Sequence, residues 1–557
     1  MMPPSAEPAQ HTPYTISEAS EMARTVSSVS HAAHDDLARS QSPNSALQGM
    51  PVGAGLDGQV VDLEKHAEPT PQERKMEAAG DVIWVEFEDN DPEDPFNFST
   101  RRKWIITCLA VFFTAEVAAT ASAYVPGIPS MERDLNVTNH TMSLLGISIY
   151  ALGFAIPPLV LAPLSEVFGR NPIYLVCHLC YTVLFIGVGA AQNIQTVLIC
   201  RFLSGAFGST GSTMVGGTIA DIFRSSERGQ PMALFATAAI FGTGFGPVWA
   251  GWVEQNSSLE WRWIAWIQAI YTGVGFIVIA FFLKETRGGI ILTRRAHRLR
   301  KTTGDQRYRA RAEEERASVP ILIKNSLTRP LLFLFTEPIV TFFSLWVSFT
   351  WGFLYLLLSS IGFVSALHNY TPGQNGLVFL SICFSAILGN LLNPLQERMY
   401  ARNFPKRGPE ARLYSACVGA VAFPVGCFIY GWTSYSHVSM AGPIVGVVVL
   451  MTGVYHIYLA CFNFLSDSYL TYASSALAAQ SFARNMFAFA FPLFVKPMYE
   501  HLGYQWASSL AGFVGLALGT VPFILFGYGK SIRAKSKVYQ QLQRDAEERA
   551  RKTSSSS

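Results

Sequence analysis

Ionisable residues stand inside long apolar stretches of the sequence, where a charge needs a partner or a watery cavity. Glu116 and Arg201 lie in the first half of the chain, and Asp467 and Arg484 lie in the second. A buried carboxylate can take up and release a proton, so Glu116 is the first candidate proton carrier and Asp467 the second. We expect Glu116 and Arg201 to serve a transport cavity. The alternative is an ion pair, between these two or with others, that only holds helices together.

Aromatic and amide side chains occur along the same stretches and are candidate walls of such a cavity. The candidates are Tyr124, Trp346, Trp351, Tyr355, Asn390, Tyr455 and Tyr458. An apolar, aromatic pocket with few polar groups suits amphipathic or lipophilic molecules. Aromatic residues near the ends of a span can instead anchor a protein at the membrane interface. Both interpretations stay open for each residue.

The apolar stretches predict the helices that must position these side chains. Half of the 557 residues are hydrophobic and only 15% are charged, whereas a soluble domain carries about 25% charged residues. A helix of about 20 mostly apolar residues crosses a bilayer. Such stretches cover 104–124, 142–164, 172–191, 196–222, 232–253, 263–283, 338–366, 375–395, 413–432, 440–465, 476–495 and 506–528. We therefore predict an all-α polytopic membrane protein with about twelve transmembrane helices in two six-helix bundles.

The distribution of basic residues predicts the orientation of these helices. Arg101, Arg102 and Lys103 precede the first span, and further arginines and lysines fill the other predicted inner segments. The predicted outer loops 192–195, 368–374 and 434–439 contain none. Since basic loops stay inside, both termini should be cytoplasmic and the number of spans even. Glycosylation sequons at Asn136, Asn139 and Asn256 fall in predicted outer loops.

Composition divides the chain into five expected segments. These are a disordered acidic cytoplasmic tail (1–100), a first bundle (101–284), a basic cytoplasmic central loop (285–330), a second bundle (331–530) and a cytoplasmic tail (531–557). Within the central loop we expect a helical segment near 307–316. Its charge is explained more simply by anionic lipid at the inner leaflet than by nucleic acid. A Pro-Leu-x-Glu pattern ends the second span of each half, at Glu166 and at Glu397, which favours a duplicated transporter.

Several motifs resemble the major facilitator superfamily. Leu164-Ser165-Glu166-Val167-Phe168-Gly169-Arg170 is similar to its loop motif between helices two and three, although Glu166 replaces an aspartate and Val167 an arginine. Arg201-Phe202-Leu203-Ser204-Gly205 resembles the fourth-helix motif. Phe464-Leu465-Ser466-Asp467-Ser468-Tyr469, followed by Ala483-Arg484, looks like helices ten and eleven of fungal twelve-span drug:proton antiporters. The resemblance covers residues 104–537 and implies proton-driven export of drugs, polyamines or secondary metabolites.

The fifth span carries a further pattern, Gly242-x-x-x-Gly246-Pro247-x-x-Ala250-Gly251, which resembles the antiporter motif of the same family. Its glycines allow a neighbouring backbone to approach closely, and Pro247 bends the helix. At the inner ends of the spans we expect Glu166, Arg170 and Asp221 to converge. Arg484 should join them from the other half. Charge pairs that break and re-form would then make a gate.

The preferred function is export of small amphipathic or lipophilic molecules, such as a glycolipid secondary metabolite or a toxin, by alternating access and proton antiport. Polyamine or organic-acid transport is the alternative within the same class, and a non-transporting membrane sensor is the alternative of another class. We expect no enzymatic activity, catalytic residue, cofactor or metal. ATP is not expected to supply the energy because no Walker motif is present. A monomer in the plasma membrane, or in a vacuolar or other internal membrane, is the expected form.

Overall fold

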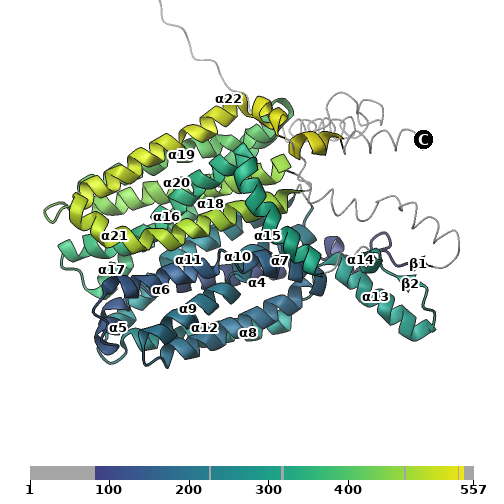
Figure 1. Cartoon of the computed structure of the whole chain (residues 1–557), viewed down its shortest axis with the longest axis horizontal. Helices are drawn as coiled ribbons and strands as arrows, with labels where there is room; N and C mark the ends of the chain where they lie inside the picture. Colours follow the sequence, from purple (N-terminus) through teal and green to yellow (C-terminus); the bar gives the residue numbers. More distant parts are fainter. Residues whose placement is uncertain (1–81, 225–226, 315–318, 470–471, 537, 545–557) are drawn as a thin grey trace, which may run out of the picture. The chain divides into compact units, whose positions relative to one another are not determined.

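The computed structural model describes residues 82–544, apart from 225–226, 315–318, 470–471 and 537. Nearly all of this part of the chain is helical (Figure 1). The first half contains α4 (Thr100–Ala123), α5 (Ile128–Asp134), α6 (His140–Gly153), α7 (Pro158–Phe168), α8 (Arg170–Gly189), α9 (Ile194–Gly208), α10 (Thr210–Ile222), α11 (Gly229–Gln255) and α12 (Glu260–Phe282). The second half contains α16 (Pro338–Leu367), α17 (Pro372–Val378), α18 (Leu380–Arg407), η3 (Gly408–Arg412), α19 (Leu413–Thr433), α20 (Ala441–Tyr469), α21 (Ala473–Leu518) and α22 (Thr520–Lys535).

These helices make twelve membrane crossings. Within the described residues, nine helical stretches are long and apolar enough to span a bilayer. Two of them, Pro372–Thr433 and Ala473–Lys535, are 62 and 63 residues long and each supplies two crossings of about 20 residues. The pair α9 and α10 adds one more. The predicted spans are confirmed, and most of their ends shift by a few residues, although α18 continues to Arg407, past the predicted end at 395.

Local sequence explains where the crossings begin and break. Ser99, Asn139 and Asn193 cap the first turns of α4, α6 and α9 by accepting hydrogen bonds from backbone N–H groups. Gly503 interrupts α21 with a φ of 74° and a ψ of 165°, a left-handed conformation that glycine adopts without strain. Because lipid offers no hydrogen bonds, each span must satisfy its backbone internally, and the breaks therefore fall between spans or inside the protein.

Packing defines two bundles with a contact between them. In the first half α4 packs on α10 and α11, α6 on α9, and α8 on α9 and α12; in the second half α19 packs on α20 and α21, and α16 on α21. The two halves meet where α11 packs against α17 and α18, and where α21 packs against α6. Large apolar side chains such as Phe281 and Leu391 stay exposed, at 77% and 71%, which suits contact with lipid.

A small folded segment joins the two halves on the inner side. It contains β1 (Ile83–Trp84), η1 (Pro95–Asn97), α13 (Gly288–Thr303), β2 (Tyr308–Arg309), α14 (Arg311–Glu314) and α15 (Val319–Thr336). β1 pairs in parallel with β2, and Val85 packs against Ala296 and Ala310. Figure 1 shows α13, α14 and the two strands lying together.

One sequence-based expectation for this segment was wrong, and another holds only in part. The tail was expected to be disordered up to residue 100, but residues 82–99, named the strap, contain β1 and η1. Asp91 of the strap pairs with Arg295 of α13 at 2.6 Å, so the acidic run is neutralised by the basic loop. The helix expected near 307–316 is found in part: residues 311–314 form α14, residues 308–309 form β2, and 315–316 lie outside the described residues, while the main helix of the loop is α13. The rest of the expected tail, residues 1–81, lies outside the described residues.

Candidate functional site

Glu116 lies inside the first bundle, on the face of α4 that meets α8 and α12. Its side chain is 3% exposed, and neither carboxylate oxygen has a hydrogen-bond partner among the described residues. His178 Nε2 lies 3.5 Å from Oε2, and its ring donates to the carbonyl of Thr272 at 3.1 Å. Gly275 leaves room for the carboxylate because a Cβ atom there would collide with Oε1. Glu116 is thus an enclosed acid with an imidazole close to one of its carboxylate oxygens.

Arg201 of α9 is fixed by a different set of groups. Its guanidinium lies over the rings of Tyr124 at 4.6 Å and Tyr150 at 4.5 Å, and the residue is 1% exposed. It donates to the backbone carbonyls of Gly146 (3.2 Å), Thr120 (3.2 Å) and Ala121 (3.5 Å). No carboxylate pairs with it in the described part of the chain, so the ion pair considered between Arg201 and Glu116 is not formed.

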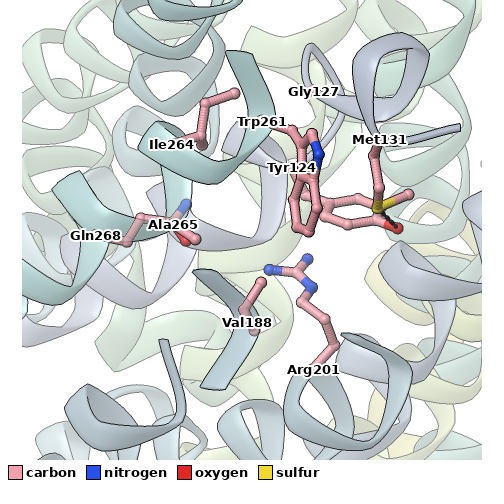
Figure 2. A pocket seen from close by; sticks show the side chains of 9 residues that line it. All are labelled: Tyr124, Gly127, Met131, Val188, Arg201, Trp261, Ile264, Ala265 and Gln268. Atoms are coloured by element: carbon pink, nitrogen blue, oxygen red, sulfur yellow. Dashed lines mark hydrogen bonds between the residues drawn. The ribbon is translucent and has the colours of Figure 1, made fainter. Parts of the chain in front are cut away.

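A cavity of about 20 Å³ adjoins the Arg201 guanidinium, which is room for about one water molecule. Figure 2 shows Arg201 directed toward the rings of Tyr124 and Trp261 across this cavity. The Tyr124 hydroxyl donates to the carbonyl of Ser143 at 2.9 Å, and Gln268 lines the same space with an amide nitrogen that has no partner in the described structure. A buried cation beside a small polar cavity can exchange its contacts when helices move.

A chain of hydroxyl groups links the surroundings of Glu116 and Arg201. It runs from Tyr150 to Tyr181 (3.4 Å), from Tyr181 to Thr120 (2.8 Å) and from Thr120 to Tyr271 (3.0 Å). Thr120 follows Glu116 by one helical turn and offers its carbonyl to Arg201. Sequence reasoning missed this chain. Its signal was the i, i+4 spacing of Glu116 and Thr120, which places both on one face of α4.

Arg484 of α21 lies in the second half among aromatic rings. Its guanidinium is 4.6 Å from the ring centroid of Trp351 and 5.0 Å from that of Tyr458, and its Nε has no hydrogen-bond partner among the described atoms. Tyr355, one turn after Trp351 on α16, is also buried. Trp351, Tyr458 and Tyr355, which interacts electrostatically with Arg484, form an aromatic cage around this cation. The adjacent Asn485 donates to the carbonyl of Phe154 at 3.0 Å and ties α21 to the first half.

The other candidate wall residues occupy different places. Trp346 is fully buried against Phe343, and its indole N–H has no partner in the described structure. Tyr455 reaches across the two halves, with its hydroxyl 3.4 Å from both the Ala233 carbonyl and the Thr237 hydroxyl. Asn390 is half-buried on α18 and its amide oxygen is likewise unpartnered among the described residues. Tyr455 therefore belongs to the contact between the halves, whereas Trp346 belongs to the packing of the second bundle.

A buried charge cluster closes the inner end of the first bundle. Arg170 Nε donates to Asp221 at 3.1 Å, and Arg170 Nη1 donates to the Ser165 hydroxyl at 2.7 Å. The backbone N–H of Arg170 donates to Glu285 at 3.0 Å. Glu166 is exposed and acts on Arg170 only through its charge. The sequence predicted that Arg170 and Asp221 lie together, but the part played by Glu285 was missed. Glu285 follows α12, the last span of the first half.

The second half carries a corresponding cluster. Arg412 donates to Glu397 at 2.8 and 3.0 Å and to Asp467 at 3.1 Å, and the Tyr400 hydroxyl donates to Asp467 at 3.1 Å. Glu397 ends the second Pro-Leu-x-Glu pattern, as Glu166 ends the first. Asp467 is therefore tied to an arginine, unlike Glu116. Arg484 makes its contacts in the aromatic cage, and no contact joins it to the Arg170 cluster among the described residues.

The glycines of α11 lie at its contacts with two other helices, α4 and α17. Cβ atoms at Gly242 and Gly246 would collide with backbone carbonyls of α4, and one at Gly251 would collide with the Pro372 carbonyl of α17. In return, a Cβ atom at Gly376 would lie 2.5 Å from the Pro247 carbonyl. Small residues thus let α11 touch its own bundle on one face and the other half on the opposite face.

Comparison with known proteins agrees with this architecture. A sequence model of the Major Facilitator Superfamily matches residues 107–492. The chain is 36% identical over 464 residues to the MFS-type efflux pump MFS2 of Trichophyton rubrum, which covers 82% of this chain and 77% of that protein. It is 35% identical over 462 residues to the Major facilitator superfamily multidrug transporter mdrA of Aspergillus fumigatus, covering 82% and 75%.

Two further similarities span nearly the whole of the compared protein. The Ascochitine biosynthesis cluster MFS transporter of Didymella fabae is 36% identical over 497 residues, covering 88% of this chain and 96% of that one. A partially occluded inward-open structure of the xylose transporter XylE from E. coli shares the fold with a TM-score of 0.56 at 13% identity, covering 77% and 98%.

Proposed function

The chain belongs to the major facilitator superfamily, in the branch of fungal drug-efflux proteins that its motifs resemble, and from this we propose that it exports small amphipathic or lipophilic molecules in exchange for protons. It is a multi-pass membrane transporter that moves a small-molecule substrate, not an enzyme. The observation that supports export most strongly is the identity above 30%, over four fifths of the chain, to proteins named efflux pumps or multidrug transporters.

Alternating access would use the contact between the halves. On the outer side, α11 and α17 approach through glycines, so the two backbones touch without intervening side chains. On the inner side, each half ends in its own charge cluster, around Arg170 and around Arg412. Two rigid bundles with small-residue contacts can rock against each other around a site between them. The clusters would keep the inner helix ends of each bundle together during this movement.

Proton coupling would use Glu116. It is enclosed, it has no fixed cationic partner in the described structure, and it stands one turn from the hydroxyl chain. A proton could reach a carboxylate in such a place through hydroxyl groups and transient water. His178 would then orient or share the proton. Asp467 is the weaker candidate because Arg412 and Tyr400 already occupy its oxygens.

Substrate contacts would come from the aromatic cage of Trp351, Tyr355, Tyr458 and Arg484. Large aromatic faces suit lipophilic molecules, such as a secondary metabolite of glycolipid type. One observation favours the organic-acid alternative: the Arg484 guanidinium keeps an unpaired Nε, and arginine binds carboxylates well. Polyamine transport lacks a comparable observation, because no acid joins the cage among the described residues. The proposal also places the chain in the plasma membrane as a monomer.

Flux through proteoliposomes tests this proposal. The purified protein is reconstituted, a fluorescent lipophilic substrate is added, and a pH gradient is applied and then collapsed with a protonophore. We expect transport that depends on the gradient. A membrane sensor on the same fold would bind the compound without gradient-dependent flux, and that outcome would reject the proposal.

A further inference from the structure

A pocket of about 230 Å³ lies at the inner membrane boundary of the first half, away from the aromatic cage and Glu116. Four segments meet there: the strap, the first turn of α4, the residues after α12, and α13. Its lining residues are Pro92, Glu93, Phe98, Arg102, Lys284, Glu285, Ile291, Arg294 and Arg298. The proposed transport cycle does not use this pocket.

The charges of the pocket leave an excess of cations. Both lining carboxylates face basic or backbone N–H groups: Glu93 lies 3.0 Å from Arg295, and Glu285 Oε1 accepts the backbone N–H groups of Arg170, Thr286 and Arg287 at 3.0 to 3.1 Å, while its Oε2 lies 3.7 Å from Arg294. In contrast, Arg102 and Lys284 have no ion-pair partner in the described structure. The Arg102 guanidinium is held at 3.5 Å over the Phe98 ring, which fixes its position. An anion is the ligand that these groups can accept.

The neighbourhood of the pocket indicates the kind of anion. Lys284 follows Phe281 and Phe282, whose side chains are 77% and 62% exposed at the end of α12, where acyl chains of the inner leaflet would lie. We propose that this pocket binds the phosphate headgroup of an anionic phospholipid, with its acyl chains along α12. Arginine and lysine both bind phosphate oxygens, arginine through its planar fork and lysine as a point charge.

Lipid bound here would be in contact with the inner charge cluster. Arg294 lines the pocket and also lies 3.7 Å from Glu285, which in turn holds the first turn of α8 at Arg170. A headgroup phosphate would draw Arg294 away from Glu285. The lipid would also bridge α13 and α4, and so fix the strap against the first bundle.

Native mass spectrometry of the full-length detergent-solubilised protein tests the site. Phosphatidylserine is titrated against the wild type and the double variant R102Q/K284Q, with phosphatidylcholine as the neutral lipid. The control is R398Q/R402Q, which removes the same charge from exposed residues near the inner end of α18. Each cation near a membrane surface contributes about a fivefold gain in affinity for anionic lipid. We therefore expect R102Q/K284Q to lose about 25-fold in affinity for phosphatidylserine, and the control to lose less than about threefold.

Three further measurements make the result decisive. R102K/K284R should keep phosphatidylserine binding, and all variants should unfold at the same temperature. Inorganic phosphate at millimolar concentration is added as a competitor to distinguish a lipid from a free anion. Equal loss of phosphatidylserine in R102Q/K284Q and R398Q/R402Q would overturn the site. Binding of inorganic phosphate with no preference for phosphatidylserine over phosphatidylcholine would overturn the lipid.

Discussion

Replacing Gly376 by alanine is expected to open the transporter toward its outer side. In the structure a Cβ atom at this position of α17 would lie 2.5 Å from the Pro247 carbonyl and 3.2 Å from that of Val248, whereas ordinary contacts begin at 3.4 Å. The two helices would have to separate by about 1 Å, and overpacking of this kind costs about 1–3 kcal/mol. Because only the state with α17 against α11 bears this cost, its population relative to the open state should fall about 5- to 150-fold.

Cys383 is a natural reporter for this change. It is 4% exposed, and its sulfur lies 3.5 Å from the Phe241 carbonyl, at the same contact between the halves. A membrane-impermeant maleimide added from outside should label it at least about fivefold faster in Gly376→Ala than in the wild type. A Cys383→Ser protein gives the background. Gly362→Ala is the matched control, because its Cβ would lie 3.9 Å from Asn375. Equal labelling of Gly376→Ala, Gly362→Ala and wild type would refute the reasoning.

Three other perturbations have defined outcomes. Asp221→Asn leaves Arg170 buried without its carboxylate, at a cost of about 3–5 kcal/mol, so the unfolding temperature in detergent should drop; an unchanged temperature would contradict the buried pair. Arg295→Ala should raise hydrogen exchange in the strap at neutral pH. Arg295 lowers the pKa of Asp91. The stability that this ion pair contributes in the wild type is therefore complete above the ordinary carboxyl pKa of about 4, and it is lost as the pH falls through the lowered pKa of Asp91. Equal protection of the strap from hydrogen exchange in the wild type and in Arg295→Ala would show that the pair of Asp91 and Arg295 does not hold the strap. Enzymatic deglycosylation should raise gel mobility, with single Asn→Gln variants identifying the sites used, and no shift would count against all three sequons. The sequons are those at Asn136, Asn139 and Asn256.

The membrane fold was readable from the sequence because lipid imposes a simple rule. Every crossing needs about 20 apolar residues in a helix, and this signal placed the twelve spans, most of them to within a few residues. The strap was not readable in the same way. Its acidic run is typical of disorder when taken alone, and it folds only because Arg295 and the β2 strand, some 200 residues later, supply charge and hydrogen bonds.

Some contacts of the candidate site residues could be predicted from the sequence, and others could not. Arg170 and Asp221 lie together as predicted, since topology alone places the inner ends of adjacent spans close to each other. The partners of Arg201 and Arg484 could not be predicted, because both are held by carbonyls or ring faces. These groups are available on every helix, so only packing decides which one is used. The ion pair between Glu397 and Arg412 could not be predicted either, because it depends on the turn at η3.

Glu116→Gln tests proton coupling most directly. Glutamine keeps nearly the size and hydrogen-bonding capacity of the carboxyl group but cannot exchange a proton at neutral pH. Proton coupling through Glu116 predicts that, in proteoliposomes, export driven by a pH gradient falls to the rate without a gradient, while the same substrate still binds. The control Glu260→Gln, at the start of α12 where Glu260 pairs with Arg133 at the surface, should transport as the wild type does. Undiminished gradient-driven export by Glu116→Gln would contradict the proposed mechanism.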